Sequence, residues 1–250
     1  MSPHHSRYRL NAKIEEQEQF EREVEKICET YLSAEENERK GIHTISTDEK
    51  TGIQALERIA PNRPMEPGKP ERIEYEYKRH GTTCLFGNRD VGRGGILSPF
   101  LNPTRTEEDF ARNINMIVAT APEAGWIFVS DNLNTHQSES LVLAAADMLG
   151  IDRALLGKKE KYGILKSMAS RKAFLEDESH RIRFVYTPKH CSWLNQIEVW
   201  FSGLSSRILR RGSFDSVETL NRKIRDYITF YDQTAKPMNW KCPGLSAKVA

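Results

Sequence analysis

The sequence predicts an α/β fold in which a mixed sheet is flanked by helices, with a further helix near the N-terminus. Two observations support this fold class. Strand-like runs gather before residue 100, and helical patterns then alternate with strands toward the C-terminal region. That order favours a mixed sheet covered by helices. The chain of 250 residues is long enough for one full-sized core and too short for several independent domains.

Residues 14–40 form the predicted N-terminal helix. The segment is rich in Glu and Lys, and its apolar residues repeat at helical spacing. The narrow apolar stripe consists of Ile14, Phe20, Val24, Ile27, Cys28 and Tyr31. We expect an acidic helix that packs on the domain, and its negative charge makes it a poor contact for a polyanion.

The first predicted strand covers residues 41–49. Side chains alternate along it between two faces, and it ends in Asp48 and Glu49. A loop is expected next, because closely spaced prolines resist both a helix and a central strand. The four prolines are Pro61, Pro64, Pro67 and Pro70.

Three further strand-like runs cover residues 72–78, 82–88 and 96–100. A glycine-rich turn at residues 92–95 joins the last two. Because it lacks the GxGxxG spacing and no helix follows it, it predicts a hairpin turn rather than a phosphate-binding loop.

The second half of the chain alternates between helices and strands. The expected order is a helix over about 106–120, a strand over 126–130, a helix over about 138–148, a strand over 182–186 and two C-terminal helices. Residues 152–180 are rich in Lys and only weakly periodic. They predict an insertion with a short helix near residues 165–175.

The net charge of +2 hides an uneven distribution along the chain. Residues 158–225 contain 15 Lys or Arg and 7 Asp or Glu, which gives +8 and leaves −6 for the remainder. A basic stretch in an otherwise acidic chain is typical of a surface that binds a polyanion, because Lys and Arg displace counterions from phosphates. A solvated surface is the alternative.

Composition excludes several classes of protein. No apolar stretch approaches the ~20 residues that a membrane span requires, and residues 1–10 lack the apolar core of a secretory signal. We therefore expect a cytoplasmic protein without a membrane partner.

The cysteines form no CxxC pair, which leaves no local zinc or redox motif and predicts free thiols. They are Cys28, Cys84, Cys191 and Cys242.

Two further acids occupy positions suited to catalysis. Asp131 directly follows the apolar run 126–130, at the rim where open α/β sheets place their sites; the alternative is an acid that begins a turn or caps the next helix. Glu198 lies about one turn into a helix expected to begin near residue 192, with an apolar face that packs on the sheet. A solvated glutamate is the alternative for that position.

Asp48, Asp131 and Glu198 together form the predicted metal site. Mg²⁺ prefers oxygen ligands and keeps several waters, which leaves coordination positions for phosphates. Two such ions, for which Mn²⁺ can substitute, activate a water or a 3′ hydroxyl on one side and stabilise the leaving oxygen on the other. Positive charge beside Glu198 would suit a phosphate backbone. The cationic candidates are Lys189, His190, Arg207, Arg210 and Arg211.

Four segments carry a resemblance to a known family. They are TDEKTGIQALER from Thr47, HGT from His80, SDNLNTHQSESL from Ser130 and TPKHCSWLNQIEVWFSGLSSRILRRGSF from Thr187. In this order they resemble the DDE transposases of the bacterial insertion-sequence branch of the Tc/mariner superfamily. The resemblance covers residues 41–235.

This resemblance implies an RNase H-like fold with a five-stranded mixed sheet, and a catalytic triad of Asp48, Asp131 and Glu198 that binds Mg²⁺. The implied reaction is cleavage of double-stranded DNA at transposon ends and transfer of the freed 3′ hydroxyl into target DNA. It further implies a homodimer on paired ends, associated with the bacterial nucleoid when bound. The residues implied to orient the metal ligands or position the substrate are Glu49, Asn132, Asn134, His136, His190 and Asn195.

Three features depart from the family pattern. Asp131 and Glu198 are separated by 66 residues, more than the pattern has, and the insertion at 152–180 accounts for the excess. Relatives carry an N-terminal helix-turn-helix module, whereas residues 1–40 hold at most the region that follows one. Two interpretations stay open: a truncated gene product, or one half of a split transposase whose helix-turn-helix module is separately encoded. Residues 236–250 form a tail without an assigned role.

The alternatives to a transposase are a non-catalytic DNA- or partner-binding derivative and a structure-specific nuclease on the same fold.

Overall fold

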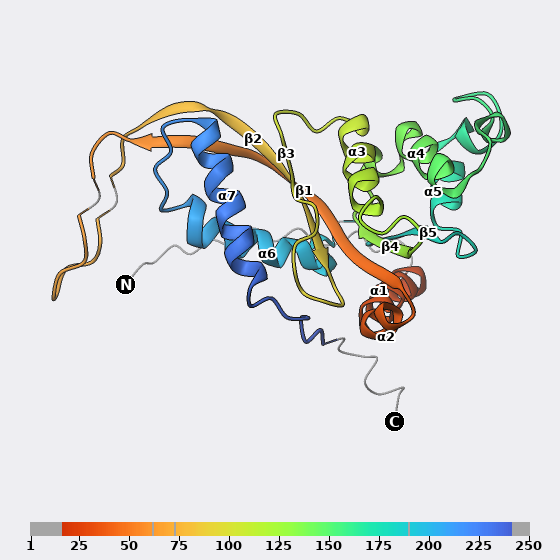
Figure 1. The fold of residues 1–250 in the computed structure, drawn as a ribbon, viewed down its shortest axis with the longest axis horizontal. Helices are drawn as coiled ribbons and strands as arrows, with labels where there is room; N and C mark the ends of the chain where they lie inside the picture. The colour runs from red at the N-terminus through yellow and green to blue at the C-terminus, as the bar shows by residue number, and fades with distance from the viewer. Residues whose placement is uncertain (1–16, 62, 73, 190, 242–250) are drawn as a thin grey trace.

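The computed structural model describes residues 17–61, 63–72, 74–189 and 191–241. Its centre is a five-stranded sheet with the strand order β3-β2-β1-β4-β5 (Figure 1). The strands are β1 (Ile42–Arg58), β2 (Tyr77–Asp90), β3 (Phe100–Asn102), β4 (Gly125–Ser130) and β5 (Ile182–Tyr186). β1, β2 and β3 pair antiparallel, whereas β1, β4 and β5 pair parallel. This is the mixed sheet that the sequence pattern predicts, with the five strands that the family resemblance implies.

Helices cover both faces of the sheet. They are α1 (Gln17–Leu32), α2 (Ala34–Arg39), α3 (Glu107–Val118), α4 (Glu139–Leu149), α5 (Met168–Leu175), α6 (Gln196–Leu204) and α7 (Val217–Asp232). Because side chains alternate along a strand, Phe128 of β4 packs on one face with α3, α4 and α5, and the next residue, Val129, packs on the other with α1. On that second face, α6 and α7 cover β1 and β2 through a cluster that contains Leu85 and Phe201.

Short helical turns connect these elements. They are the 3-10 turns η1 (Asn134–Gln137), η2 (Arg153–Leu156), η3 (Ile164–Lys166) and η4 (Ser192–Leu194), and the π-helical turn η5 (Ser205–Leu209). The predicted insertion 152–180 contains η2, η3 and α5, and its apolar side chains join the core on the α3–α4 face.

The elements from α3 to β5 lie where the sequence predicts them, because local signals define their ends. Thr106 caps α3 by accepting the N–H of Asp109 at 3.2 Å, and Ser138 caps α4 by accepting the N–H of Leu141 at 3.2 Å. α4 ends at Gly150, whose φ of +70° is a left-handed conformation that glycine adopts without strain.

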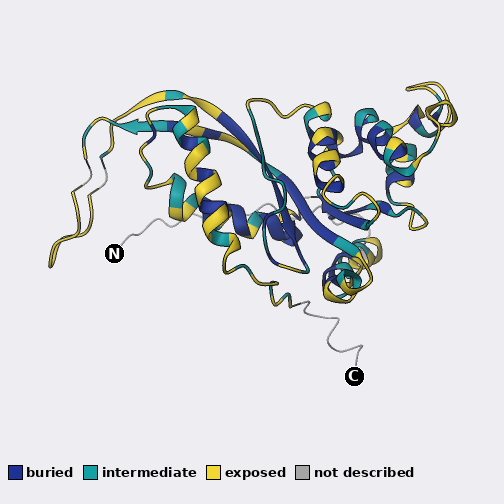
Figure 2. Ribbon diagram, viewed as in Figure 1, coloured by how far each residue is buried: buried dark blue, intermediate teal, exposed yellow. Residues whose placement is uncertain are grey.

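β1 and β2 are longer than predicted, and they form a hairpin that projects from the helices (Figure 1). β1 continues to Arg58, beyond the expected end at residue 49, and β2 begins only at Tyr77, so a separate strand over residues 72–78 was a wrong prediction. The prolines lie in the loop of this hairpin. We call residues 51–83 the arm; Figure 2 shows that its outer part is largely exposed.

The N-terminal helix is interrupted, which corrects the prediction of one helix over residues 14–40. Its described part divides at Ser33 into α1 and the short α2, while residues 14–16 lie outside the described residues. The buried stripe is nonetheless the predicted one, since Ile27 and Tyr31 contribute to the core beneath β4.

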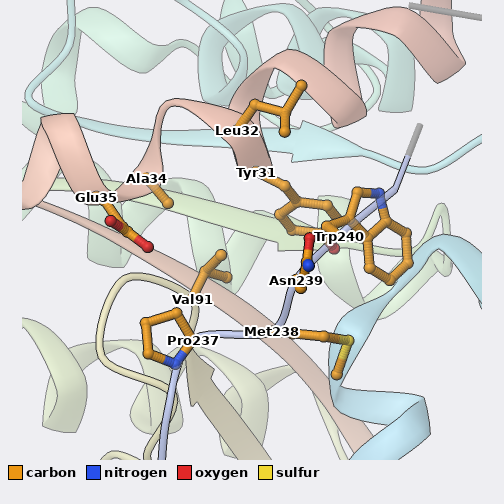
Figure 3. A pocket seen from close by; sticks show the side chains of 9 residues that line it. All are labelled: Tyr31, Leu32, Ala34, Glu35, Val91, Pro237, Met238, Asn239 and Trp240. Carbon is orange, nitrogen blue, oxygen red and sulfur yellow. The ribbon is translucent and has the colours of Figure 1, made fainter. Parts of the chain in front are cut away.

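Residues 237–240 pack against this helical pair, and Lys236 accepts a hydrogen bond from Arg89, so the first part of the predicted tail has a defined place. The ring of Trp240 meets that of Tyr31 edge-on, with centroids 5.2 Å apart. Figure 3 shows both rings in the wall of a pocket between α1, α2 and the chain from Pro237 to Trp240. Residues 242–250 lie outside the described residues.

The structure bears on two predictions made from composition, one about the cysteines and one about membrane spans. Cys84 and Cys191 are free and buried, as predicted, whereas Cys28 is disulfide-bonded, so the prediction of free thiols throughout was wrong. No helix within the described ranges has the length and apolar character needed to cross a membrane.

Candidate active site

Asp48 and Asp131 lie side by side where the parallel pairing of β1 with β4 ends. The last paired residues are Ser46 and Val129, and each acid follows two residues later in the chain: Asp48 lies within β1, which continues to Arg58, and Asp131 directly follows β4. Asp48 is only 7% exposed. Burial, and then the negative charge of Asp131, raise the pKa of Asp48 to about 7. The two carboxylates are therefore close enough to repel each other.

A glycine on β2 lets a helix approach this pair. Gly87 is the antiparallel partner of Asp48, so a side chain there would point to the same face of the sheet. A Cβ on Gly87 would lie 2.6 Å from Cε1 of Phe201 and 3.1 Å from Cδ1 of Ile197. Only glycine leaves room for α6 to rest directly on the strand next to Asp48.

Asn195 fixes the beginning of α6 to β1. Its Nδ2 donates to Oδ2 of Asp48 and to the backbone carbonyl of Thr47, both at 3.1 Å. Ser46 completes the link, because its hydroxyl donates to Oδ1 of Asn195 and accepts the N–H of Ile197 at 2.9 Å. Asn195 is fully buried. It thus orients Asp48 and anchors the helix at the same time.

Glu198 lies in the first turn of α6, half-buried, where the helix dipole favours a negative charge. Burial raises the pKa of Glu198; of the nearby charges, Lys50 lowers it and Asp131 raises it. Glu198 is therefore within electrostatic range of Asp131. β1, β4 and α6 therefore place Asp48 and Glu198 within electrostatic range of Asp131, although the three acids are distant in sequence. Among the described residues, their ligand atoms do not form a group within 4.8 Å of one another.

His136 is buried between Asp131 and a further acid, Glu49, and contacts both. Its Nδ1 is 2.6 Å from Oδ1 of Asp131, and its Nε2 is 3.0 Å from Oε2 of Glu49. Burial disfavours the charged ring, but the hydrogen bonds with Asp131 and Glu49 outweigh burial and raise the pKa of His136 to about 10. Burial also disfavours ionised Asp131, yet the bond to His136 prevails and lowers the pKa of Asp131. His136 is therefore a cation that holds Asp131 charged and in place.

The ligand atoms of Asp48, Glu49 and His136 lie within 4.8 Å of one another, which is a spacing compatible with a metal ion. Histidine is a poor ligand here, because an imidazolium that donates from both nitrogens has no free lone pair. The oxygen-only set of Asp48, Asp131 and Glu198 fits a hard cation such as Mg²⁺. The mutual repulsion around the buried Asp48 is a second observation that fits a bound positive charge.

The remaining predicted residues divide into two groups. Asn132 supports the site from behind: its Nδ2 donates to the carbonyl of Thr187 at 2.6 Å, and its Oδ1 accepts from Gln137 at 2.7 Å, so it ties the ends of β4 and β5 together. The others are exposed, namely Asn134, Lys189, Arg207, Arg210 and Arg211. His190 lies outside the described residues.

Sequence reasoning missed Ser46, Gly87 and Gln137. A glycine within a strand is a recognised sign of close backbone approach, so Gly87 carried a usable signal. Ser46 and Gln137 carried none, because their partners, Asn195 and Asn132, could be identified only once the strands and α6 were placed.

Carboxylates contributed by two parallel strands and a helix are compatible with metal-dependent phosphodiester chemistry. Comparison with known families agrees. The model of the DDE superfamily endonuclease family matches residues 43–221, a range that includes all three acids. The chain belongs to this family.

Solved structures of the Mos1 mariner transposase share the fold. The paired-end complex with Mn matches with a TM-score of 0.52 at 18% identity, over 93% of this chain and 62% of that one. The strand transfer complex matches with a TM-score of 0.50 at 18% identity, over 92% and 59%. The paired-end complex with Mg matches with a TM-score of 0.50 at 14% identity, over 95% of this chain and 62% of that one. The chain thus spans less than two thirds of these proteins. No curated protein matches the sequence.

Proposed function

We propose that this chain is the catalytic domain of a Tc/mariner-type transposase of the bacterial insertion-sequence branch, which cleaves DNA at transposon ends and transfers the strand into target DNA. The observation that carries the proposal is the convergence of Asp48, Asp131 and Glu198 from β1, β4 and α6 in a DDE endonuclease family member. Residues 41–235 form the catalytic domain in this proposal.

The chain's own residues prepare the carboxylates for a cation. Asn195 donates to Asp48, and His136 donates to Asp131, so neither acid needs to reorient when an ion arrives. A pair of Mg²⁺ ions, when bound, would activate the attacking water or 3′ hydroxyl and stabilise the leaving oxygen. The same carboxylates serve both steps, because each step displaces a phosphodiester oxygen.

The substrate in this proposal is double-stranded DNA, first the transposon end and then the target. The exposed cations Lys189, Arg207, Arg210 and Arg211 supply contacts to phosphate. The Mos1 structures are paired-end and strand transfer complexes; by analogy, two copies of this chain would act on two ends, each together with a helix-turn-helix module. The site of action would be the bacterial nucleoid.

The first test is thermal melting with and without millimolar Mn²⁺. Ligand at about ten times its dissociation constant stabilises the folded state by about 1.4 kcal/mol, which shifts the melting curve by a few degrees. We expect this shift in the wild type and its loss in Asp48→Asn and Asp131→Asn. Asp147→Asn is the matched control, because Asp147 is an exposed acid that pairs with Arg153 on the surface.

A second assay separates metal binding from the reaction. Incubation of the wild type with Mn²⁺ and a nicked DNA duplex should give strand cleavage or joining that the Asp131→Asn variant lacks. Cleavage without any joined product would favour a structure-specific nuclease. Metal binding without either product, in the presence of a helix-turn-helix partner, would contradict the proposed activity.

A further inference from the structure

A groove leads away from the carboxylates along β1. It lies between the strand just past Asp48 and the π-helical turn η5 that continues α6, and it has a volume of about 280 Å³. Lys50 and Gln54 line it from the strand, and Ser205 and Arg210 line it from the turn. The groove therefore offers two cations and two hydrogen-bonding side chains, and its end nearest the site is Lys50.

Lys50 is placed between the acids and this groove. It follows Asp48 by two residues on β1 and therefore points to the same face, toward α6. Its Nζ lies 5.8 Å from the ring centroid of Phe201, and its charge lowers the pKa of Glu198. Within the described residues, Lys50 forms no ion pair at 4.0 Å or less. The cationic side chain of the half-buried Lys50 is thus held beside the site, within electrostatic range of Glu198 but without a direct ion pair among the described residues.

The strand is irregular at this point. The pairing of β1 with β2 shifts between Lys50 and Ile53, and Gly52 adopts a φ of +63°. Such a bulge bends a strand and redirects its side chains, and bulges are common next to active sites. A Cβ on Gly52 would meet no atom within 4 Å, so the bulge opens toward solvent rather than toward packed side chains.

A second hollow lies further along β1, toward Arg58. It has a volume of about 260 Å³ and is lined by Arg58 of β1 and by Arg211 and Ser213 after η5. The hydroxyl of Ser213 accepts the N–H of Arg58 at 2.9 Å, which holds the two sides together. The cations Lys50, Arg210, Arg211 and Arg58 thus follow one edge of β1 from the carboxylates out to the arm.

We infer that this groove holds the sugar-phosphate backbone of the DNA strand next to the scissile phosphate, with Lys50 as the positioning residue at its inner end. The inference rests on the proposed function and extends it, because it assigns a route for the strand and a role to Lys50, Gln54 and Arg58. Lysine binds phosphate as a point charge and needs no fixed geometry. Contacts of this kind fix the position of a strand without reading its sequence.

The test is the salt dependence of DNA binding. A fluorescent nicked duplex of arbitrary sequence is titrated with protein in Ca²⁺ buffer between about 50 and 200 mM NaCl, and log Kd is plotted against log salt. Lys50→Met keeps an unbranched apolar side chain over Phe201 but removes the charge, so we expect the slope to fall by about 1, as for one lost phosphate contact. Lys50→Arg restores the charge and should restore the slope.

Two further variants localise the effect. Arg210→Gln should lower the slope by a similar amount, and the double variant with Lys50→Met should lower it by about 2. Lys40→Gln is the matched control, because Lys40 is an exposed cation at the opposite end of β1 that pairs with Glu36. It should bind like the wild type.

The outcomes distinguish this inference from the proposed function. A wild type that binds and cleaves the duplex, with an unchanged slope in Lys50→Met and Arg210→Gln, would overturn the groove while leaving the catalytic assignment intact. Equal losses in Lys50→Met and Lys50→Arg would also overturn it, because they would show a packing role. A wild type that fails to bind DNA at all would overturn both proposals.

Discussion

At the scale of single residues, the candidate site depends on side chains that hold other side chains. His136 has no exposed surface, yet it connects Asp131 at the rim to Glu49 inside the fold. Asn195 does the same between Asp48 and α6. The family resemblance implied such supporting roles for His136 and Asn195, but it did not identify the side chains to which either residue is hydrogen-bonded. The partners follow only from the tertiary structure, since 147 positions separate Asn195 from Asp48.

Replacing His136 tests this supporting role. In His136→Gln the charge is lost, and Glu49 is left buried without a cation, so we expect the free energy of unfolding to fall by about 3–5 kcal/mol. The affinity for Mn²⁺, measured by calorimetric titration of the folded variant, should fall roughly 10- to 100-fold, as is typical when a group that orients a metal ligand is removed.

A second variant separates the two effects. Glu49→Gln combined with His136→Gln removes both buried charges and should recover part of the lost stability, while Mn²⁺ affinity stays low because Asp131 is still unsupported. A single His136→Gln variant with wild-type affinity would show that His136 serves folding alone.

At the scale of elements, the position of α6 decides whether Glu198 can join the other acids. The helix rests on β2 at Gly87, where a methyl group would overlap Phe201. In contrast, a Cβ on Gly203 of α6 itself would have its nearest neighbour, the hydroxyl of Tyr227, at 3.7 Å. The two glycines therefore allow a matched experiment on the same interface.

Gly87→Ala should displace α6 and destabilise the protein by about 1–3 kcal/mol, the usual cost of overpacking. Because Glu198 moves with the helix, the stabilisation by Mn²⁺ should also decrease. Gly203→Ala should leave both quantities unchanged or raise stability, since alanine favours the helix. Chemical denaturation with and without Mn²⁺ measures both effects. Wild-type behaviour of Gly87→Ala would show that the close approach has no role in the site.

The elements that were predicted correctly have their signals in local sequence. β4 is a short apolar run, and α3 and α4 have capping residues at Thr106 and Ser138. The arm has no such signal: its pairing joins residues far apart in the chain, and the bulge at Gly52 breaks the alternation that marks a strand. The break at Ser33 was also unpredictable, because the helical pattern continues across it.

At the scale of the whole molecule, the topology creates the candidate site. Because β4 lies parallel and adjacent to β1, Asp48 and Asp131 meet where the pairing of these two strands ends, and α6 supplies the third acid. Periodicity predicted the mixed sheet, and positions at strand ends and in a helix suggested the three acids with a structural alternative for Asp131 and for Glu198; the family motifs then favoured the catalytic interpretation. The arm projects from the helices (Figure 1), and the groove lies along its base.

The central claim is that Asp48, Asp131 and Glu198 share a divalent cation, and anomalous diffraction from a crystal grown with Mn²⁺ tests it most directly. We expect an anomalous peak among these three carboxylates, with His136 still bonded to Asp131 and Glu49. A peak coordinated by His136, a peak only at the distant group of Glu38, His43 and Asp90, or no peak at saturating Mn²⁺ would contradict the account.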